Sequence, residues 1–62
     1  MKQITRREAE ALFYKSKIVS TNIEQDKNEM RILLTQSNDS VFLIKYDLIH
    51  HKKSYFFIRI KR

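Results

Sequence analysis

Residues 29–48 read EMRILLTQSNDSVFLIKYDL, which is two alternating segments on either side of a polar turn. Because successive side chains in a strand point to opposite faces, each segment gathers apolar residues on one face. These residues are Met30, Ile32 and Leu34, followed by Phe42, Ile44, Tyr46 and Leu48. Ser37-Asn38-Asp39 between them are residue types that form tight turns. The stretch therefore predicts an antiparallel hairpin with strands at residues 29–36 and 40–49.

One further strand is expected on each side of this hairpin. Residues 18–25 alternate between apolar and polar types, and residues 54–61 are rich in aromatic and β-branched side chains. The apolar face of the last strand is expected to comprise Phe56, Ile58 and Ile60. Polar turns at residues 26–28 and 50–53 join these strands to the hairpin. Short turns make neighbouring strands antiparallel, so the four strands form a meander.

A helix is expected before the strands, at residues 6–16. Thr5 and Glu8 have the spacing of a capping box, in which each side chain bonds the backbone amide of the other residue. The apolar residues that would cover the sheet are Ile4, Ala9, Leu12 and Phe13. The predicted class is thus α+β, one N-terminal helix followed by a four-stranded antiparallel β-meander, and 62 residues are expected to form a single domain, residues 1–62.

The composition argues against several kinds of chemistry. Without cysteine there is no disulfide and no thiolate-ligated metal, and without glycine there is no P-loop or dinucleotide-binding fingerprint. His50 and His51 are adjacent, so in an extended chain they point apart and make poor joint metal ligands, although Asp47 could pair with one of them. We therefore expect no cofactor, no metal site, no catalytic residues and no enzymatic activity.

The hydropathy pattern predicts a protein that stays in the cytoplasm. The charged N-terminal residues are not followed by the apolar core of a signal peptide. The longest apolar runs, Val41–Ile44 and Tyr55–Ile58, are much shorter than a membrane-spanning helix requires. No membrane association is expected.

The net charge of +6 is unevenly distributed along the chain. Residues 1–17 carry +3 and residues 41–62 carry +5, whereas residues 18–40 carry −2. A cationic surface built from the two ends of the chain favours DNA, RNA or another anionic partner. The simpler explanation is that the charge only keeps a small protein in solution.

A second apolar group falls on the face of the strands that the helix cannot cover. On the predicted register it comprises Leu33, Val41, Leu43, Ile49, Tyr55 and Phe57. Three interpretations stay open: the sheet curls towards a small barrel, two copies stack these faces as a homodimer, or Tyr55 and Phe57 stack on the bases of a single-stranded nucleic acid.

The leading hypothesis is a small, basic, non-enzymatic module that forms a dimer and associates with nucleic acid through phosphate contacts. The residues expected to bind are Lys2, Arg6, Arg7, Lys45, Lys52, Lys53, Tyr55, Phe57, Arg59 and Lys61. The alternative is a protein-binding inhibitor or adaptor, such as a phage or mobile-element protein that blocks a host enzyme. The interface for a second copy or another protein would then comprise Leu33, Val41, Leu43, Tyr55 and Phe57.

Overall fold

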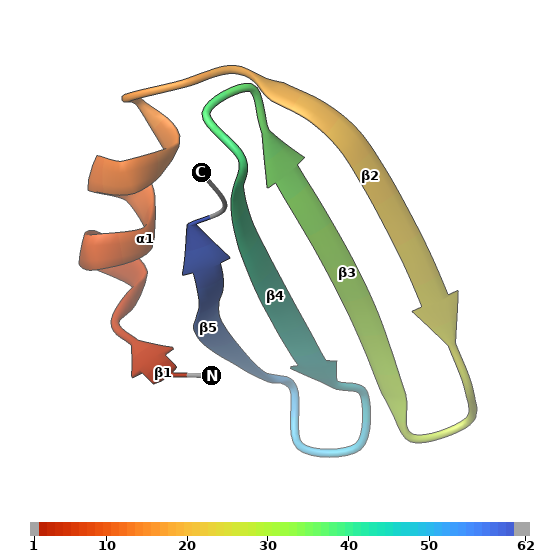
Figure 1. The fold of residues 1–62 in the computed structure, drawn as a ribbon. Coiled ribbons are helices and arrows are strands. Elements are labelled where there is room, and N and C mark those ends of the chain that lie inside the picture. The colour runs from red at the N-terminus through yellow and green to blue at the C-terminus, as the bar shows by residue number, and fades with distance from the viewer. Residues whose placement is uncertain (1, 61–62) are drawn as a thin grey trace.

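One short helix and five strands make up the fold in a computed structural model that describes residues 2–60, with side chains as far as Ile58. The elements are β1 (Lys2–Ile4), α1 (Arg6–Phe13), β2 (Ile18–Gln25), β3 (Glu29–Gln36), β4 (Ser40–Asp47) and β5 (Lys52–Ile60). All five strands lie in one antiparallel sheet in the order β1-β5-β4-β3-β2 (Figure 1). The α+β class and the meander of four consecutive strands are confirmed.

The fifth strand, β1, is the main difference from the predicted topology. It pairs with β5, and Ile4 lies opposite Tyr55. Lys2–Ile4 is too short to show an alternating pattern, so only its pairing with a strand more than 45 residues away in sequence reveals it. The consequence is that the two ends of the described chain lie side by side at one edge of the sheet.

The helix begins as predicted and ends earlier. Thr5 Oγ1 accepts a hydrogen bond from the Glu8 amide at 3.1 Å, and Glu8 Oε1 accepts one from the Thr5 amide at 3.0 Å, which completes the capping box. The helix stops at Phe13 rather than at residue 16, because the chain turns at Tyr14 towards β2. No helix within residues 2–60 is both long enough and apolar enough to span a membrane.

Side-chain hydrogen bonds shape the turns in place of glycine. Asp26 Oδ1 accepts from the amides of Asn28 and Glu29, both at 2.9 Å, and Asn38 Oδ1 accepts from the Ser40 amide at 3.0 Å. Asp47 similarly holds the β4–β5 turn, and this is why β4 ends there rather than at residue 49.

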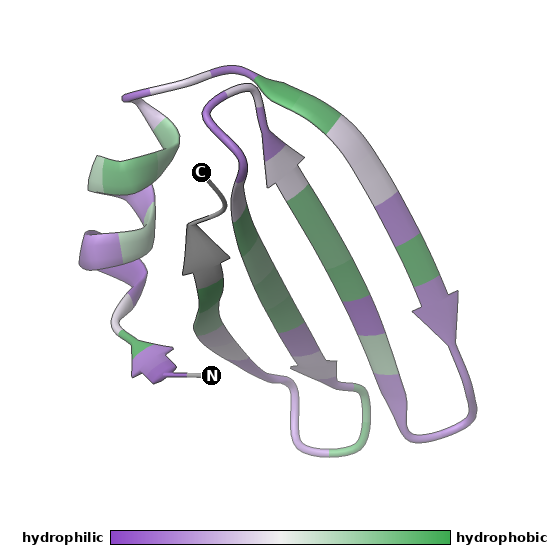
Figure 2. Cartoon of the chain, viewed as in Figure 1, coloured by the Kyte–Doolittle hydropathy of each residue, from purple (hydrophilic) through white to green (hydrophobic). Residues whose placement is uncertain are grey.

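The core lies between α1 and one face of the sheet. Phe42 is 2% exposed, and its ring centroid is 5.1 Å from those of both Phe13 and Phe57, with edge-on geometry. Leu34 and Ala9 are also buried there. We call this the helix face, which on the strands includes Leu34, Phe42 and Phe57. Figure 2 shows apolar residues in the middle of β3 and β4, in the second half of α1, and both at the start and near the end of β2.

Candidate nucleic-acid interface

Pairing of β1 with β5 gathers most of the predicted basic residues in one half of the sheet, where Lys2 and Lys53 lie on the helix face and Lys45 and Lys52 on the opposite face. Lys2 lies in β1, opposite Phe57, and Arg6 and Arg7 open the helix that follows. Lys52 and Lys53 begin β5, and Lys45 lies in the adjacent β4. We call these six residues the basic side. They come from both ends of the chain, so only the tertiary structure brings them together.

The structure does not describe the side chains of two predicted basic residues, Arg59 and Lys61. The backbone register puts Arg59 opposite Val41, in the last part of β5. Its side chain and Lys61 lie outside the described part of the structure. The nucleic-acid role of both residues stays a prediction.

Acidic residues gather at the opposite side of the sheet. Glu24 is in β2, Asp26 is in the turn that follows, and Glu29 begins β3. Arg31 is held among them, with Nη1 2.6 Å from Glu29 Oε2 and 3.7 Å from Asp26 Oδ2. These contacts neutralise Arg31 locally, and the Glu29 hydrogen bond raises the pKa of its guanidinium. Charge is therefore segregated across the sheet.

The carboxylates on the basic side already have partners. Glu10 accepts a hydrogen bond from Arg6 Nε at 2.9 Å, and Glu8 belongs to the capping box, whose hydrogen bonds with Thr5 lower the pKa of its carboxyl. The Arg6–Glu10 pair is exposed on both sides, and such surface pairs hold little energy and exchange readily for other anions.

The face of the sheet opposite α1 has no helix over it, and we call it the open face. Residues that pair across neighbouring strands share a face, so Leu33, Leu43 and Phe56 all lie on it. Lys45 follows in the adjacent row, and its ammonium nitrogen is 5.5 Å from the centroid of the Phe56 ring. A half-buried aromatic ring beside a cation thus lies where β4 meets β5.

The predicted positions of Tyr55 and Phe57 on this face are wrong. Phe57 lies opposite Phe42 and Tyr55 lies opposite Ile44, both on the helix face. The cause is a β-bulge at Ile58, which adds one residue to β5 and reverses the phase of alternation before it. Strict alternation along β5, which takes no account of the bulge, therefore assigns Phe56 and Phe57 to the wrong faces. Phe57 packs in the core and is not available for stacking, whereas Phe56 is on the open face.

Two of the predicted interface residues do lie together on the open face. Leu33 and Leu43 are directly opposite each other and half-buried, and with Asn22, Glu24 and Arg31 they line a shallow hollow. Val41 is on the same face but is only 9% exposed. Ile49 is 60% exposed in the β4–β5 turn and does not belong to either face of the sheet.

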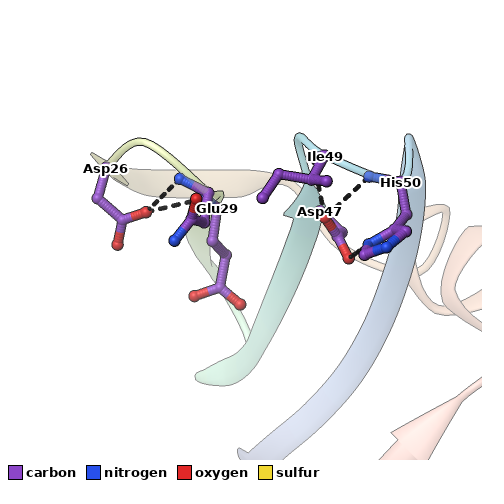
Figure 3. Close-up of a pocket in the computed structure, with 6 residues that line it drawn as sticks. Asp26, Glu29, Asp47, Ile49 and His50 are labelled. Carbon is purple, nitrogen blue, oxygen red and sulfur yellow. Dashed lines mark hydrogen bonds and ion pairs between the residues drawn. The ribbon is translucent and has the colours of Figure 1, made fainter.

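A separate pocket between the β2–β3 and β4–β5 turns contains Asp26, Glu29, Asp47 and His50 (Figure 3). Asp47 accepts hydrogen bonds from the amides of Ile49 and His50, and its Oδ2 is 2.8 Å from His50 Nδ1. The hydrogen bonds from the His50 amide and ring lower the pKa of Asp47, and those from the Asn28 and Glu29 amides lower that of Asp26. The expected Asp47–histidine pair is confirmed, and it involves His50.

These carboxylates hold the turns in shape. Among the described residues, no group of three histidine, aspartate or glutamate side chains is arranged to bind a metal ion.

Comparison of the chain with protein-family models, curated proteins and solved structures finds no match.

Proposed function

We propose that this domain binds nucleic acid, with its basic side contacting phosphates and Phe56 on the open face contacting bases. The observation that carries the proposal is the charge segregation across the sheet. Six cationic residues from both ends of the chain lie on β1, β5, β4 and the start of α1, and the acidic residues of β2 and β3 lie on the other side.

The surroundings of Lys45 support contact with an extended single strand. Its ammonium group lies over Phe56, and Lys52 is on the same face two positions further along the paired strands. An aromatic ring offers a stacking surface to any unpaired base, and nearby ammonium groups attract the phosphates between bases. Stacking of neighbouring base pairs in a duplex hides the faces of the bases, so this arrangement favours single-stranded DNA or RNA.

Binding through phosphates requires a strong dependence on salt. Each contact releases condensed counterions, so the logarithm of the association constant falls linearly with the logarithm of salt concentration. The slope reports the number of phosphates that the protein neutralises. It also separates this mode of binding from apolar contact, which depends weakly on salt.

The test is fluorescence anisotropy with labelled single-stranded DNA, RNA and duplex DNA of mixed sequence, in a series of salt concentrations. We expect affinity for single strands to fall steeply with salt. Reversing Lys52 and Lys53 to Glu should lower affinity and reduce the magnitude of the slope by about 1.4 for single strands and about 1.8 for duplex DNA, because two phosphate contacts are lost.

Lys27→Glu is the matched control, because Lys27 is also exposed but lies in the β2–β3 turn among the acidic residues. It should alter binding much less than either Lys52→Glu or Lys53→Glu. Absence of binding at low salt would refute the proposal, and an equal effect of Lys27→Glu would remove the basic side from the interface.

Binding of a protein to the open face is the second candidate, favoured by the half-buried pair Leu33 and Leu43. An inhibitor or adaptor would use these residues as apolar anchors. Leu43→Lys would abolish such binding and would leave salt-dependent nucleic-acid affinity intact or raised.

A further inference from the structure

The strand β2 is an uncovered edge of the sheet. It is last in the strand order, and all eight of its residues are exposed. An edge strand presents one row of backbone N–H and C=O groups that no neighbouring strand satisfies. The other edge differs, because β1 has only three residues and continues directly into α1.

The sequence of β2, IVSTNIEQ, has few features that protect an edge from pairing. It has no proline and only one charged residue, Glu24. A bulge occurs at Val19, near its start, and the remaining residues, Ser20–Gln25, pair regularly with β3. Val19 and Ile23 are 63% and 61% exposed, which is high for β-branched apolar side chains.

An apolar row crosses the helix face and ends at this edge. Successive pairings join one residue from each strand, namely Ile4, Tyr55, Ile44, Ile32 and Ile23. None of the five is buried. The helix covers the neighbouring row, where Phe42 and Leu34 are buried, so this row remains accessible and Ile23 is its exposed end.

The charge distribution permits a second copy of the chain to approach through β2. Two copies of a protein with a net charge of +6 repel each other, and the repulsion is strongest between their basic sides. Residues 18–40, which include β2 and β3, carry only −2, so contact from β2 to β2 brings together smaller charges than contact between the basic sides.

We propose that two copies pair antiparallel through β2, around a two-fold axis at Ile23, to form one continuous sheet. In this register Ile23 faces Ile23 of the second copy, and the two apolar rows become one. Glu24 faces Asn22 rather than another carboxylate, so the only charged residue of the strand meets no like charge. The basic sides lie at the two outer ends of the combined sheet, where their repulsion is smallest.

The first test is sedimentation equilibrium of the purified chain, without nucleic acid, over a range of concentrations. The wild type should show a reversible monomer–dimer equilibrium. Ile23→Lys should weaken dimerisation by about tenfold or more, because it buries a charge at the two-fold axis.

Ile49→Lys is the matched control. Ile49 is 60% exposed against 61% for Ile23, the charge change is identical, and Ile49 lies in the β4–β5 turn, outside β2. This variant should dimerise like the wild type. Circular dichroism of both variants establishes that the monomer stays folded.

A second test traps the pairing directly, which is possible because the chain contains no cysteine. Residues opposite each other in antiparallel strands have Cβ atoms about 4.5 to 5.5 Å apart, close enough for a disulfide after small adjustment. Ile23→Cys should form a disulfide-linked dimer under mild oxidation much faster than Ile49→Cys.

Several results would overturn the proposal. A wild-type protein that is monomeric at every concentration excludes dimerisation. A dimer that Ile23→Lys leaves intact excludes the β2 edge, as does equal cross-linking of the two cysteine variants. Because these experiments contain no nucleic acid, their outcome is independent of the proposed nucleic-acid binding.

Discussion

The side-chain amide nitrogen of Gln36 lies 3.2 Å from the carbonyl oxygen of Leu12 and donates a hydrogen bond to it across 24 residues of sequence. The same nitrogen is 3.4 Å from the Phe13 carbonyl oxygen and 3.0 Å from that of Ser16. The last carbonyl groups of a helix have no partners within the helix. The side chain of Gln36, which is only 1% exposed, thus donates hydrogen bonds from β3 to carbonyl groups at the end of α1 and anchors that end to the sheet.

Replacing Gln36 with Met should destabilise the domain by about 2 kcal/mol, because a side chain of similar size remains while carbonyl groups at the helix end lose their donor. Urea unfolding followed by circular dichroism measures the free-energy change. Gln25→Met, in the exposed strand β2, is the control and should change stability by about 0.5 kcal/mol or less. Equal effects of the two changes would contradict a structural role for the Gln36 amide.

The faces of β5 can be tested with two neighbouring phenylalanines. Phe57→Lys should unfold the domain, because it places a charge against the buried ring of Phe42, and the loss of a core phenylalanine alone costs about 3 to 5 kcal/mol. Phe56→Lys should leave a folded protein, since Phe56 lies on the open face. The melting temperatures of the two variants test this prediction. A Phe56→Lys variant less stable than Phe57→Lys would contradict the assignment of Phe57 to the helix face.

Acid should destabilise the domain partly through Asp47. Hydrogen bonds from His50 and Ile49 lower the pKa of this carboxyl in the folded state. Its contribution to stability is therefore complete above the unfolded pKa of about 4 and is lost as the pH falls through the lower folded value. Asp47→Asn should flatten the dependence of the unfolding free energy on pH below about 4, relative to the wild type. An unchanged pH dependence in urea titrations would argue against these hydrogen bonds.

Two turn residues adopt backbone angles that favour glycine, in a chain that has none. Asp39 has φ of 67° and His51 has φ of 56°. Left-handed backbone costs a residue with a Cβ atom about 1 kcal/mol, so Asp39→Gly should raise the unfolding free energy by up to about 1 kcal/mol. Lys27→Gly, at a turn position without positive φ, should lower it slightly through the greater freedom of the unfolded chain. Stabilisation by both changes would contradict this explanation.

The strand pattern and the capping box were accessible from the sequence because they depend on local interactions. The bounds predicted for β2 and β3, residues 18–25 and 29–36, match the structure, since alternation and the polar residues Asp26 and Asn28 define these strands within a few positions. Thr5 and Glu8 likewise lie within one turn of the helix that they begin. The uneven distribution of charge along the chain is also a property of the sequence alone.

Only the tertiary structure decided which residues meet. The β1–β5 pairing joins the two ends of the chain and so creates the basic side, yet Lys2–Ile4 has no local pattern that indicates a strand. The bulge at Ile58 decided that Phe56 rather than Phe57 lies on the open face, because both phases of a Tyr-Phe-Phe-Ile segment are apolar and alternation cannot choose between them. Local physical chemistry determined the elements of this protein, and contacts between distant residues determined its surfaces.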